Sequence, residues 1–411
     1  MNYIDLFAGA GGLSEGFIRS GFYPIAHVEM DEAACYTLKT RTAYHYLKRK
    51  KKDEYLKYLK GDIDRATLYS LVPEEEMNCI INLALSDENN ASIFKKIDAR
   101  LKGEVDLIIG GPPCQAYSLV GRARSENKMI DDPRNHLYLQ YSKFIVKYKP
   151  KIFVFENVVG LRSADKGRYF EKMKAEFARI GYAVKDFLFN ASDFGVLQNR
   201  KRIILVGHRK ELNLTIPDIK PKPDMQFKVQ SIFQDLPKLQ AGQGKDKGDK
   251  YATGTNDYLN YSHIRNGIEV LTQHVCRPHT EQDKEIYRIA VGLMKGGNRL
   301  NYINLPERLK THNNRHSFFD RFKVVNSNFL AAQTVVAHIA KDGHYYIHPD
   351  IKQNRSISVR EAARLQSFPD DFYFEGVKEG RNRTAAFKQI GNAVPPLMAH
   401  IIAKSLIKVL T

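Results

Sequence analysis

The stretch Asp106–Ser118, with the sequence DLIIGGPPCQAYS, decides how the rest of the chain is interpreted. It starts as a short apolar strand that ends at Gly110–Gly111. Pro112–Pro113 makes the following turn rigid, because proline fixes φ and has no backbone N–H. Cys114 comes directly after this turn, and a cysteine that only fills space in the core does not need such a frame. Since α/β folds place chemistry at the carboxyl ends of parallel strands, the stretch predicts a reactive cysteine there.

Composition narrows the class of protein. The 411 residues suffice for one large domain and a smaller one. Hydrophobic residues make up 43% of the chain, which is enough for a sizeable core. The 64 Lys and Arg residues exceed the 46 Asp and Glu residues and give a net charge of +18. This charge favours a polyanionic partner, nucleic acid first, although a solvated basic surface explains it nearly as well.

Cysteine and histidine spacing argues against metal and disulfide frameworks. The four cysteines are scattered and form no CxxC pair: Cys35, Cys79, Cys114 and Cys276. His338, His344 and His348 match no standard zinc spacing, so we expect no metal. The sequence opens without a signal segment, and no apolar run looks long enough to span a bilayer. We therefore expect a cytoplasmic protein, with no membrane partner, in which Cys114 stays a free thiol.

Two strand ends near the N-terminus indicate a nucleoside-containing cofactor. The strand Tyr3–Phe7 is followed by the glycine-rich turn Ala8–Gly12 and a helix, an arrangement in which backbone can approach a ligand closely. A second strand, Pro24–Val28, ends at Glu29, where a carboxylate can accept hydrogen bonds from ribose hydroxyls. A GxGxxG fingerprint is absent. A tight structural turn and a helix cap by Asp31 are the alternative interpretations.

The region on either side of the Cys114 stretch is less informative. The charge run KRKKK, Lys48–Lys52, is typical of a solvated face. Gly61–Ile63 is interpreted as the end of a third strand, which would point Asp62 at the adenine end of the cofactor, and Pro73–Lys102 reads as helical. Beyond Cys114, the polar segment Val120–Arg134 is either a loop that closes over substrate or an ordinary surface loop.

Charged residues mark two more strand ends. The strand Lys151–Phe155 leads into Glu156, which can act as an acid or as a structural hydrogen-bond acceptor. The segment QNRKR, Gln198–Arg202, precedes the strand Ile203–Gly207. In an extended segment Gln198, Arg200 and Arg202 share one face, which suits a phosphate or a base edge. A basic strand end at the surface is the alternative.

The composition changes after Arg209. Prolines and a Gly- and Lys-rich linker interrupt the alternation of strands and helices, so we place a domain boundary between Arg209 and Pro217. The segment that follows is rich in side chains that read base edges and hold phosphates, among them Arg299, Arg308, Arg315, Arg321, Asn313 and Asn314. SVREAARLQ, Ser358–Gln366, predicts a capped helix, and Leu397–Val409 predicts a closing one.

Together these motifs resemble the bacterial DNA (cytosine-5)-methyltransferases. Six segments match that family in its order and nearly span the chain: DLFAGAGG (5–12), GGPPCQAYS (110–118), FENV (155–158), QNRKR (198–202), RSISVREAARLQSFP (355–369) and QIGNAVPP (389–396). The resemblance implies an α/β fold, with a Rossmann-like S-adenosylmethionine-dependent methyltransferase domain and a smaller target recognition domain. It assigns residues 1–212 and 385–411 to the catalytic domain and 213–384 to the recognition domain, whose variable part is about 217–350.

The resemblance also implies a mechanism. Cys114 would attack carbon 6 of a cytosine, which makes carbon 5 nucleophilic enough to accept a methyl group. Glu156 would protonate or hydrogen-bond N3, Arg200 would hold the base and orient the catalytic groups, and Arg202 would lie close by. The cytosine would be flipped out of duplex DNA. Base selection is expected from Gln198, Arg299, Arg315 and Arg321.

By the same resemblance the cofactor is S-adenosylmethionine, with S-adenosylhomocysteine as product. Glu29 would take the ribose hydroxyls and Asp62 the adenine amino group. The expected cofactor residues are Phe7, Gly9, Ala10, Gly11, Gly12, Glu29, Met30, Asp62, Ile63, Pro112, Leu137, Asn392 and Ala393.

The implied partner is double-stranded DNA, bound by a monomer in the bacterial cytoplasm. The working hypothesis is a restriction-modification enzyme whose partner is a restriction endonuclease, and an orphan regulatory enzyme is equally compatible. Two rival functions stay open. One is a tRNA cytosine-5 methyltransferase on the same fold. The other is a catalytically silent DNA-binding relative, which we would expect to lack Cys114 or Glu156.

Overall fold

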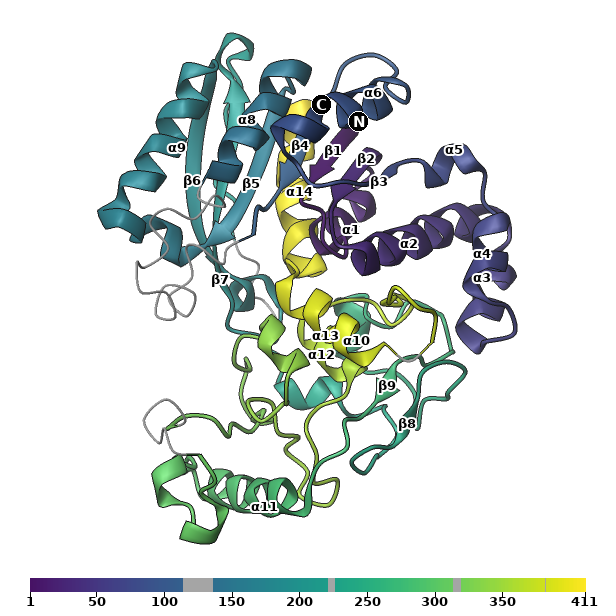
Figure 1. The fold of residues 1–411 in the computed structure, drawn as a ribbon, viewed down its shortest axis with the longest axis vertical. Coiled ribbons are helices and arrows are strands. Elements are labelled where there is room, and N and C mark those ends of the chain that lie inside the picture. The colour runs from purple at the N-terminus through teal and green to yellow at the C-terminus, as the bar shows by residue number, and fades with distance from the viewer. Residues whose placement is uncertain (114–135, 221–225, 313–318, 381) are drawn as a thin grey trace.

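A seven-stranded sheet forms the centre of the larger part of the molecule (Figure 1). The computed structural model describes residues 1–113, 136–220, 226–312, 319–380 and 382–411. The strand order is β3-β2-β1-β4-β5-β7-β6, and β7 alone runs antiparallel to its neighbours. The strands are β1 Asn2–Leu6, β2 Tyr23–Glu29, β3 Ile80–Asn82, β4 Leu107–Gly110, β5 Ile152–Val158, β6 Tyr182–Asn190 and β7 Lys201–Arg209.

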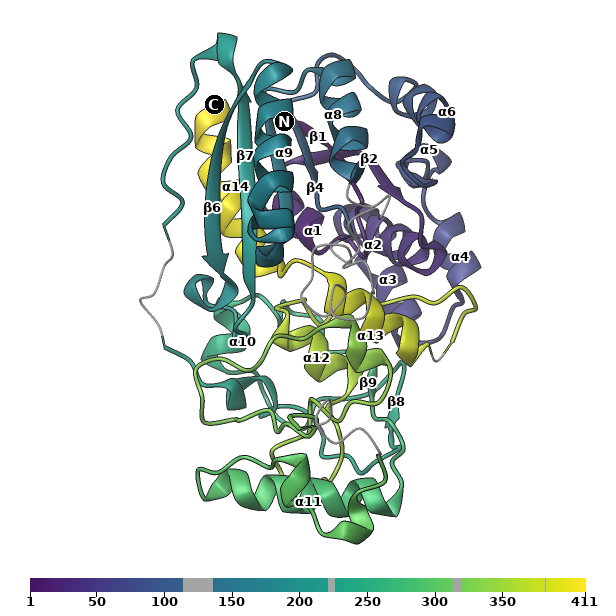
Figure 2. The ribbon, with the colours of Figure 1, turned by 60° about the vertical axis from the view of Figure 1, so that its left-hand side comes forward.

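Helices cover both faces of the sheet (Figure 2). Strand residues alternate between the faces, so Ile108 and Phe153 pack with α6, α8 and α9, whereas Ile109 and Val154 pack with α1 and α14. The helices are α1 Gly12–Arg19, α2 Glu32–Lys50, α3 Lys52–Lys60, α4 Arg65–Ser70, α5 Glu74–Met77, α6 Asp87–Asp98, α8 Leu137–Tyr148, α9 Arg168–Arg179, α10 Asp257–Tyr261, α11 Glu281–Lys295, α12 Val359–Leu365, α13 Arg383–Asn392 and α14 Pro396–Leu410. The predicted α/β class with a Rossmann-like methyltransferase domain is confirmed.

The third strand lies where the sequence predicted helix. β3 comprises only Ile80–Asn82 and falls inside the segment Pro73–Lys102. Asp62 does not end a strand, because Gly61–Ile63 forms the turn between α3 and α4. Gly61 has φ 88° and serves as the C-cap of α3, which explains why glycine precedes Asp62. The expectation that this segment closes the third strand is wrong.

The smaller part of the molecule contains α10 to α13 and the two-stranded sheet of β8, Gly244–Lys245, and β9, His274–Val275. Its main apolar cluster includes Ile357, Phe368 and Phe387, and it also takes in Leu197 from the segment before β7. The two parts therefore share a core. The predicted boundaries at residues 212 and 385 stay predictions, although Phe387 of α13 belongs to this second cluster.

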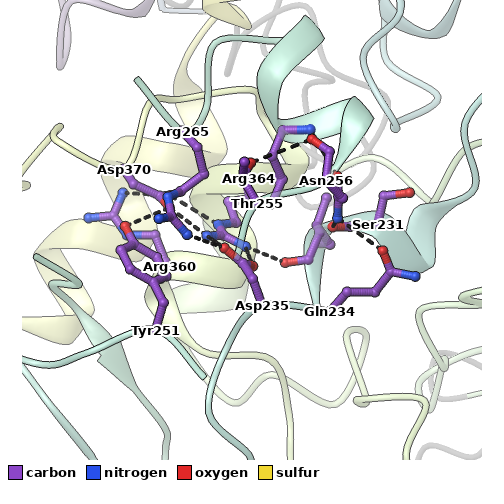
Figure 3. Close-up of polar contacts among 12 residues, drawn as sticks. Ser231, Gln234, Asp235, Tyr251, Thr255, Asn256, Arg265, Arg360, Arg364 and Asp370 are labelled. Carbon is purple, nitrogen blue, oxygen red and sulfur yellow. Dashed lines mark hydrogen bonds and ion pairs between the residues drawn. The ribbon is translucent and has the colours of Figure 1, made fainter. Parts of the chain in front are cut away.

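Buried arginines organise this smaller part (Figure 3). Arg364 of α12 contacts two carboxylates, at 2.5 Å to Asp235 and 3.0 Å to Asp370, and Arg265 approaches Asp235 at 2.6 Å. Asp370 is also the acceptor for the hydroxyl of Tyr251. All of these charged side chains are nearly inaccessible to water, so they depend on one another for compensation. The motif RSISVREAARLQSFP thus builds the fold, and its Ser358–Glu361 capping box starts α12 as predicted.

One segment of the described chain, Arg383–Leu410, is long and apolar enough to cross a bilayer, contrary to the expectation from sequence. It consists of α13 and α14, and 56% of its most apolar stretch is buried inside the protein. Ala399 of α14 packs directly on Gly16 of α1. The segment is therefore accounted for as a pair of core helices.

Candidate active site

The turn after β4 is packed against the end of β5. The buried amide of Asn157 donates a hydrogen bond to the carbonyl oxygen of Pro112 at 3.4 Å. Gly111 lies so close to Glu156 that a Cβ there would come within 2.6 Å of Oε2. The glycine in this motif is therefore required by the carboxylate beside it. Cys114 and the predicted loop Val120–Arg134 lie outside the described residues.

Glu156 forms an ion pair with Arg202. Arg202 Nε lies 2.7 Å from Glu156 Oε1, and the two side chains are 11% and 12% exposed. The antiparallel direction of β7 brings them together, since its first residues lie beside the last residues of β5. The register pairs Arg202 with Val158, two residues beyond Glu156. A carboxylate and a guanidinium are thus fixed at the strand ends, next to the turn that carries the Gly-Gly-Pro-Pro motif.

The structure separates the roles of the other two side chains in QNRKR. Arg200 is buried and donates to the carbonyl oxygens of Val335 at 2.7 Å and Gly391 at 3.1 Å. Gln198 is fully buried, donates to Leu365 O at 3.0 Å and accepts from the backbone N–H of Val335 at 2.8 Å. Gln198 therefore cannot contact DNA as predicted, because its amide is used to join the two parts of the protein. Arg202 is the arginine that pairs with Glu156, and the role expected of Arg200 towards the base stays a prediction.

The turn after β1 has the conformation expected of a ligand cradle. Phe7, Gly9 and Gly11 have φ of 58°, 54° and 83°, and such a conformation costs energy for Phe7. A Cβ on Gly9 would meet nothing within 4 Å, so the backbone there is open to a ligand. A Cβ on Gly12 would instead come within 2.4 Å of Val394 O. Gly9 thus leaves its backbone accessible to a ligand, whereas Gly12 allows the chain at Val394 to pack against it.

Glu29 is held at the end of β2 by backbone groups. Its carboxylate accepts hydrogen bonds from the N–H groups of Gly9, Met30 and Asp31, each at 2.8 Å. Burial raises the pKa of Glu29 despite these hydrogen bonds. Asp31 is the N-cap of α2 and accepts from the N–H of Ala34 at 3.2 Å. Asp31 therefore caps α2, and the role of Glu29 towards the ribose stays a prediction.

Most other residues expected to bind cofactor surround these strand ends. Met30 is 67% exposed and presents an apolar side chain beside Glu29. Asn392 is exposed at the end of α13, and the turn it begins packs on Gly12 through Ala393 and Val394. Ala10 is buried, and Leu137 is the first residue of α8. The N-terminal turn and the QIGNAVPP motif are thus in direct contact.

Asp62 and Ile63 lie elsewhere. Asp62 is exposed in the α3–α4 turn and lines a surface hollow with Asp246, Lys247 and Glu379. The residue at the end of the third strand is Asn82, whose amide donates to Glu29 O at 3.0 Å and Met30 O at 3.1 Å. The assignment of Asp62 and Ile63 to the cofactor is therefore wrong in its structural basis. Sequence reasoning missed Asn82 because β3 is only three residues long.

Two of the arginines predicted to recognise DNA lie near each other, because Arg299 pairs with the residue that precedes Arg321. Arg299 is about half exposed and pairs with Asp320. Arg321 pairs with Asp342 and contacts His338 at 3.2 Å. Arg315 lies outside the described residues. Within the described part of the chain, no three His, Cys, Asp or Glu side chains are arranged to hold a metal ion.

The family of the protein follows from a comparison with known sequences. The model of the C-5 cytosine-specific DNA methylases matches residues 1–66 and 79–408. The chain belongs to this family. The unmatched residues 67–78 lie just before β3, in the region where the sequence interpretation failed. This DNA (cytosine-5)-methyltransferase therefore performs an S-adenosylmethionine-dependent reaction.

Relatives with this family's activity cover the whole chain. The type II methyltransferase M.Bpa9945I of Bacillus paralicheniformis is 42% identical over 98% of both chains. M1.HphI of Haemophilus parahaemolyticus is 31% identical over 100% of this chain and 88% of its own. Among solved structures, a protein described as a DNA modification methyltransferase from an E. coli prophage shares the fold. Its TM-score is 0.64 at 23% identity, and the match covers 100% of this chain and 99% of the other.

Proposed function

We propose that this methyltransferase modifies carbon 5 of one cytosine within a specific short sequence of duplex DNA, through a covalent bond between Cys114 and carbon 6. The observation that carries the proposal is the Glu156–Arg202 ion pair beside the Gly111–Pro113 turn. An acid fixed by a guanidinium, one turn away from a cysteine, is the set of groups that this reaction needs.

The proposed chemistry begins with the cysteine. The Cys114 thiolate adds to carbon 6 while Glu156 gives a proton to N3, so the ring becomes an enamine that is nucleophilic at carbon 5. Arg202 keeps the Glu156 carboxyl group aimed at the base. After carbon 5 is methylated, its proton passes to water, the sulfur–carbon bond breaks, and the N3 proton returns to Glu156. Cys114 and Glu156 are then restored for another turnover.

The residues present fit S-adenosylmethionine. The open backbone at Gly9, the fixed Glu29 carboxylate and the exposed Met30 side chain would hold its amino acid, ribose and adenine parts, with Asn392 and Pro112 closing the site. When bound, this molecule supplies an electrophilic methyl group. Asn82, at the end of β3, supports this site indirectly, because its amide fixes the Glu29–Met30 backbone.

The target base is flipped out of the duplex, since carbons 5 and 6 are inaccessible inside stacked DNA. Arg299, Arg315 and Arg321 stay proposed contacts to DNA. The enzyme would act as a monomer in the bacterial cytoplasm, and its methylation would protect the host sequence from a partner endonuclease. The type II relatives, together with the net charge of +18, support this role.

Labelled methyl transfer tests the proposal. Mixed-sequence duplex DNA and tRNA are incubated with the enzyme and methyl-labelled S-adenosylmethionine, and labelled cytosines are mapped at base resolution. Label on one cytosine of a short repeated DNA motif is expected. Label confined to tRNA would overturn the proposed substrate. Ordinary turnover by a Cys114→Ala variant would overturn the proposed covalent mechanism. A duplex with 5-fluorocytosine at the target should trap the protein covalently, because fluorine cannot leave carbon 5 as a cation.

A further inference from the structure

Basic residues from four separate elements lie on one face of the molecule. Arg19 ends α1, Lys48–Lys51 ends α2, His263 follows α10, and α14 contributes His400 and Lys404. We call these residues the basic face. In both ribbon views α1 lies beside α2 and α14 (Figures 1 and 2). The charge run KRKKK, which the catalytic function does not use, is therefore one part of a larger surface.

Packing fixes the position of these elements. The hydroxyl of Ser20, next to Arg19, lies 2.8 Å from His400 Nδ1. A Cβ on Gly16 would come within 2.4 Å of both Ala399 Cβ and the backbone nitrogen of His400, so α1 and α14 are in direct contact. The basic face is thus a fixed feature of the fold, although its residues are far apart in the sequence.

Positive charges lie close to both histidines of this face. Burial, followed by the positive charges of Arg19, Lys404 and Lys48, lowers the pKa of His263. Burial and the charge of Lys404 likewise lower the pKa of His400 to about 4. Both histidines therefore experience a positive potential.

The run at the end of α2 is exposed and available. Within the described chain, no residue of Lys48–Lys51 forms an ion pair, and Lys50 donates only to the hydroxyl of Tyr46 at 3.0 Å. The acidic partner of Arg19, Glu15, is buried and already paired with Arg41. Lys48, Arg49 and Lys50 form the last turn of α2, where a helix C-terminus favours cations, and Lys51 is the C-cap.

The run Lys48–Lys51 lies far from the Glu29 end of α2. This helix starts directly after the Glu29 strand end and has 19 residues, so its far end lies roughly 28 Å from that start at 1.5 Å per residue.

We propose that the basic face binds the phosphate backbone of duplex DNA independently of the target sequence, as a second DNA-binding surface. Lysine and arginine side chains that neutralise phosphates release counterions, which gives affinity without base recognition. Such a surface keeps the enzyme on DNA between target sites, since it needs no cytosine. The inference does not depend on the covalent mechanism, and its test uses binding alone.

The test compares two variants with the same change in charge. The first carries K48Q, R49Q, K50Q and K51Q. The control carries K95Q, K96Q, K102Q and K149Q, four exposed lysines on or near α6 and α8. Both are titrated with poly(dA)·poly(dT), which contains no cytosine, over a range of salt concentrations. The first variant should lose about tenfold in affinity at about 0.1 M salt, and the slope of log K against log salt should shrink by about 2 to 4. The control should stay within about twofold of wild type.

Equal losses in the two variants would overturn the proposal, because net charge alone would then explain binding. An unchanged affinity of the first variant for DNA would also overturn it. The same holds if the first variant loses binding to phosphatidylserine vesicles but keeps its binding to DNA. Acetylation of lysines read by mass spectrometry gives a second measurement: poly(dA)·poly(dT) should protect Lys48, Lys51 and Lys404 but not Lys95. The first variant should methylate a short target duplex as well as wild type does. A failure of the DNA-binding proposal can therefore be distinguished from a failure of the methylation proposal.

Discussion

Arg202 Nε lies 2.7 Å from Glu156 Oε1, across the antiparallel boundary between β5 and β7. The single reversed neighbour of β5 is what allows this contact, because a parallel strand would bring its last residue, not its first, to the same edge. The structure brings together at this edge the side chains of Glu156 and Arg202 and the backbone of Gly111. The active-site chemistry of this methyltransferase therefore depends on the direction of one strand.

Substitution of Arg202 should affect activity, whereas substitution of Arg200 should affect stability. Arg202→Lys keeps the charge but loses the planar guanidinium that holds Glu156, so turnover should fall about 10²–10³-fold with little change in thermal midpoint. Arg200→Ala leaves the carbonyl groups of Val335 and Gly391 without their donor, and should lower the free energy of unfolding by about 2–4 kcal/mol. Methyl transfer and thermal unfolding measured side by side would reject this division if both variants changed the same quantity.

Glycine is required at position 111. Gly111→Ala would place a Cβ within 2.6 Å of Glu156 Oε2, so the carboxylate has to move and methyl transfer should be nearly abolished. Gly292→Ala is the matched control, since it lies exposed in α11 with no atom within 4 Å of the added carbon. That control should gain about 0.5–1 kcal/mol in stability and keep full activity. Retained activity in Gly111→Ala would show that the carboxylate position is not critical.

Asn82, not Asp62, should affect cofactor affinity. Asn82→Ala removes the amide that fixes the backbone of Glu29 and Met30, and the KM for S-adenosylmethionine should rise about 2- to 10-fold. Asp62→Ala should leave the KM within about twofold, because the residue lies in the exposed α3–α4 turn. The opposite ranking in initial-rate kinetics would restore the assignment made from sequence.

The buried ion pairs of the smaller part should dominate its stability. Arg364→Ala removes the cation shared by the buried carboxylates of Asp235 and Asp370 and leaves Asp370 with only Arg360, at 3.8 Å, as an ion-pair partner. Urea unfolding should show a loss of about 3–5 kcal/mol. Arg308→Ala also breaks an ion pair, with Glu285, but this pair lies at the surface, where water screens it, so the loss should be far smaller. Similar losses in the two variants would contradict a structural role for the 355–369 motif.

Two buried histidines predict acid sensitivity. Burial lowers the pKa of His348 to about 3 and that of His279 to about 4, from an ordinary value of 6.5. Between pH 6.5 and these values the unfolded chain binds more protons than the folded one. As the pH is lowered through this range, the free energy of unfolding should therefore decrease by about 1.4 kcal/mol per pH unit for each histidine. In His348→Asn this pH dependence should be shallower, and an unchanged slope would exclude that residue as a source.

The order of motifs allowed the fold to be predicted, but short or polar elements misled the prediction. Tyr3–Phe7 and Lys151–Phe155 read as strands because apolar residues run continuously through a sheet that is covered on both faces. Ile80–Asn82 has the same character over only three residues, within an otherwise polar region. Gly61–Ile63 was interpreted as a strand end, although Gly61 is the C-cap of helix α3.

Side-chain type also failed to reveal burial. Gln198 and Arg200 alternate with exposed neighbours, as residues that contact DNA would, yet both are nearly inaccessible to water. Their partners are the backbone groups of Val335, Leu365 and Gly391, and no local pattern specifies contacts between segments so far apart in the chain. Glu156 was identified correctly as lying at a strand end, because its position depends only on the strand that precedes it.

The contact between Gly16 and Ala399 sets a constraint on biosynthesis. The first strand and helix leave the ribosome long before α14, which covers their apolar side, has been made. Until then Leu13 and Phe17 have no partner from that helix, and the Gly12 turn lacks Val394 behind it. A nascent chain therefore cannot assemble the methyl-donor site, and methylation begins only after translation has passed residue 400.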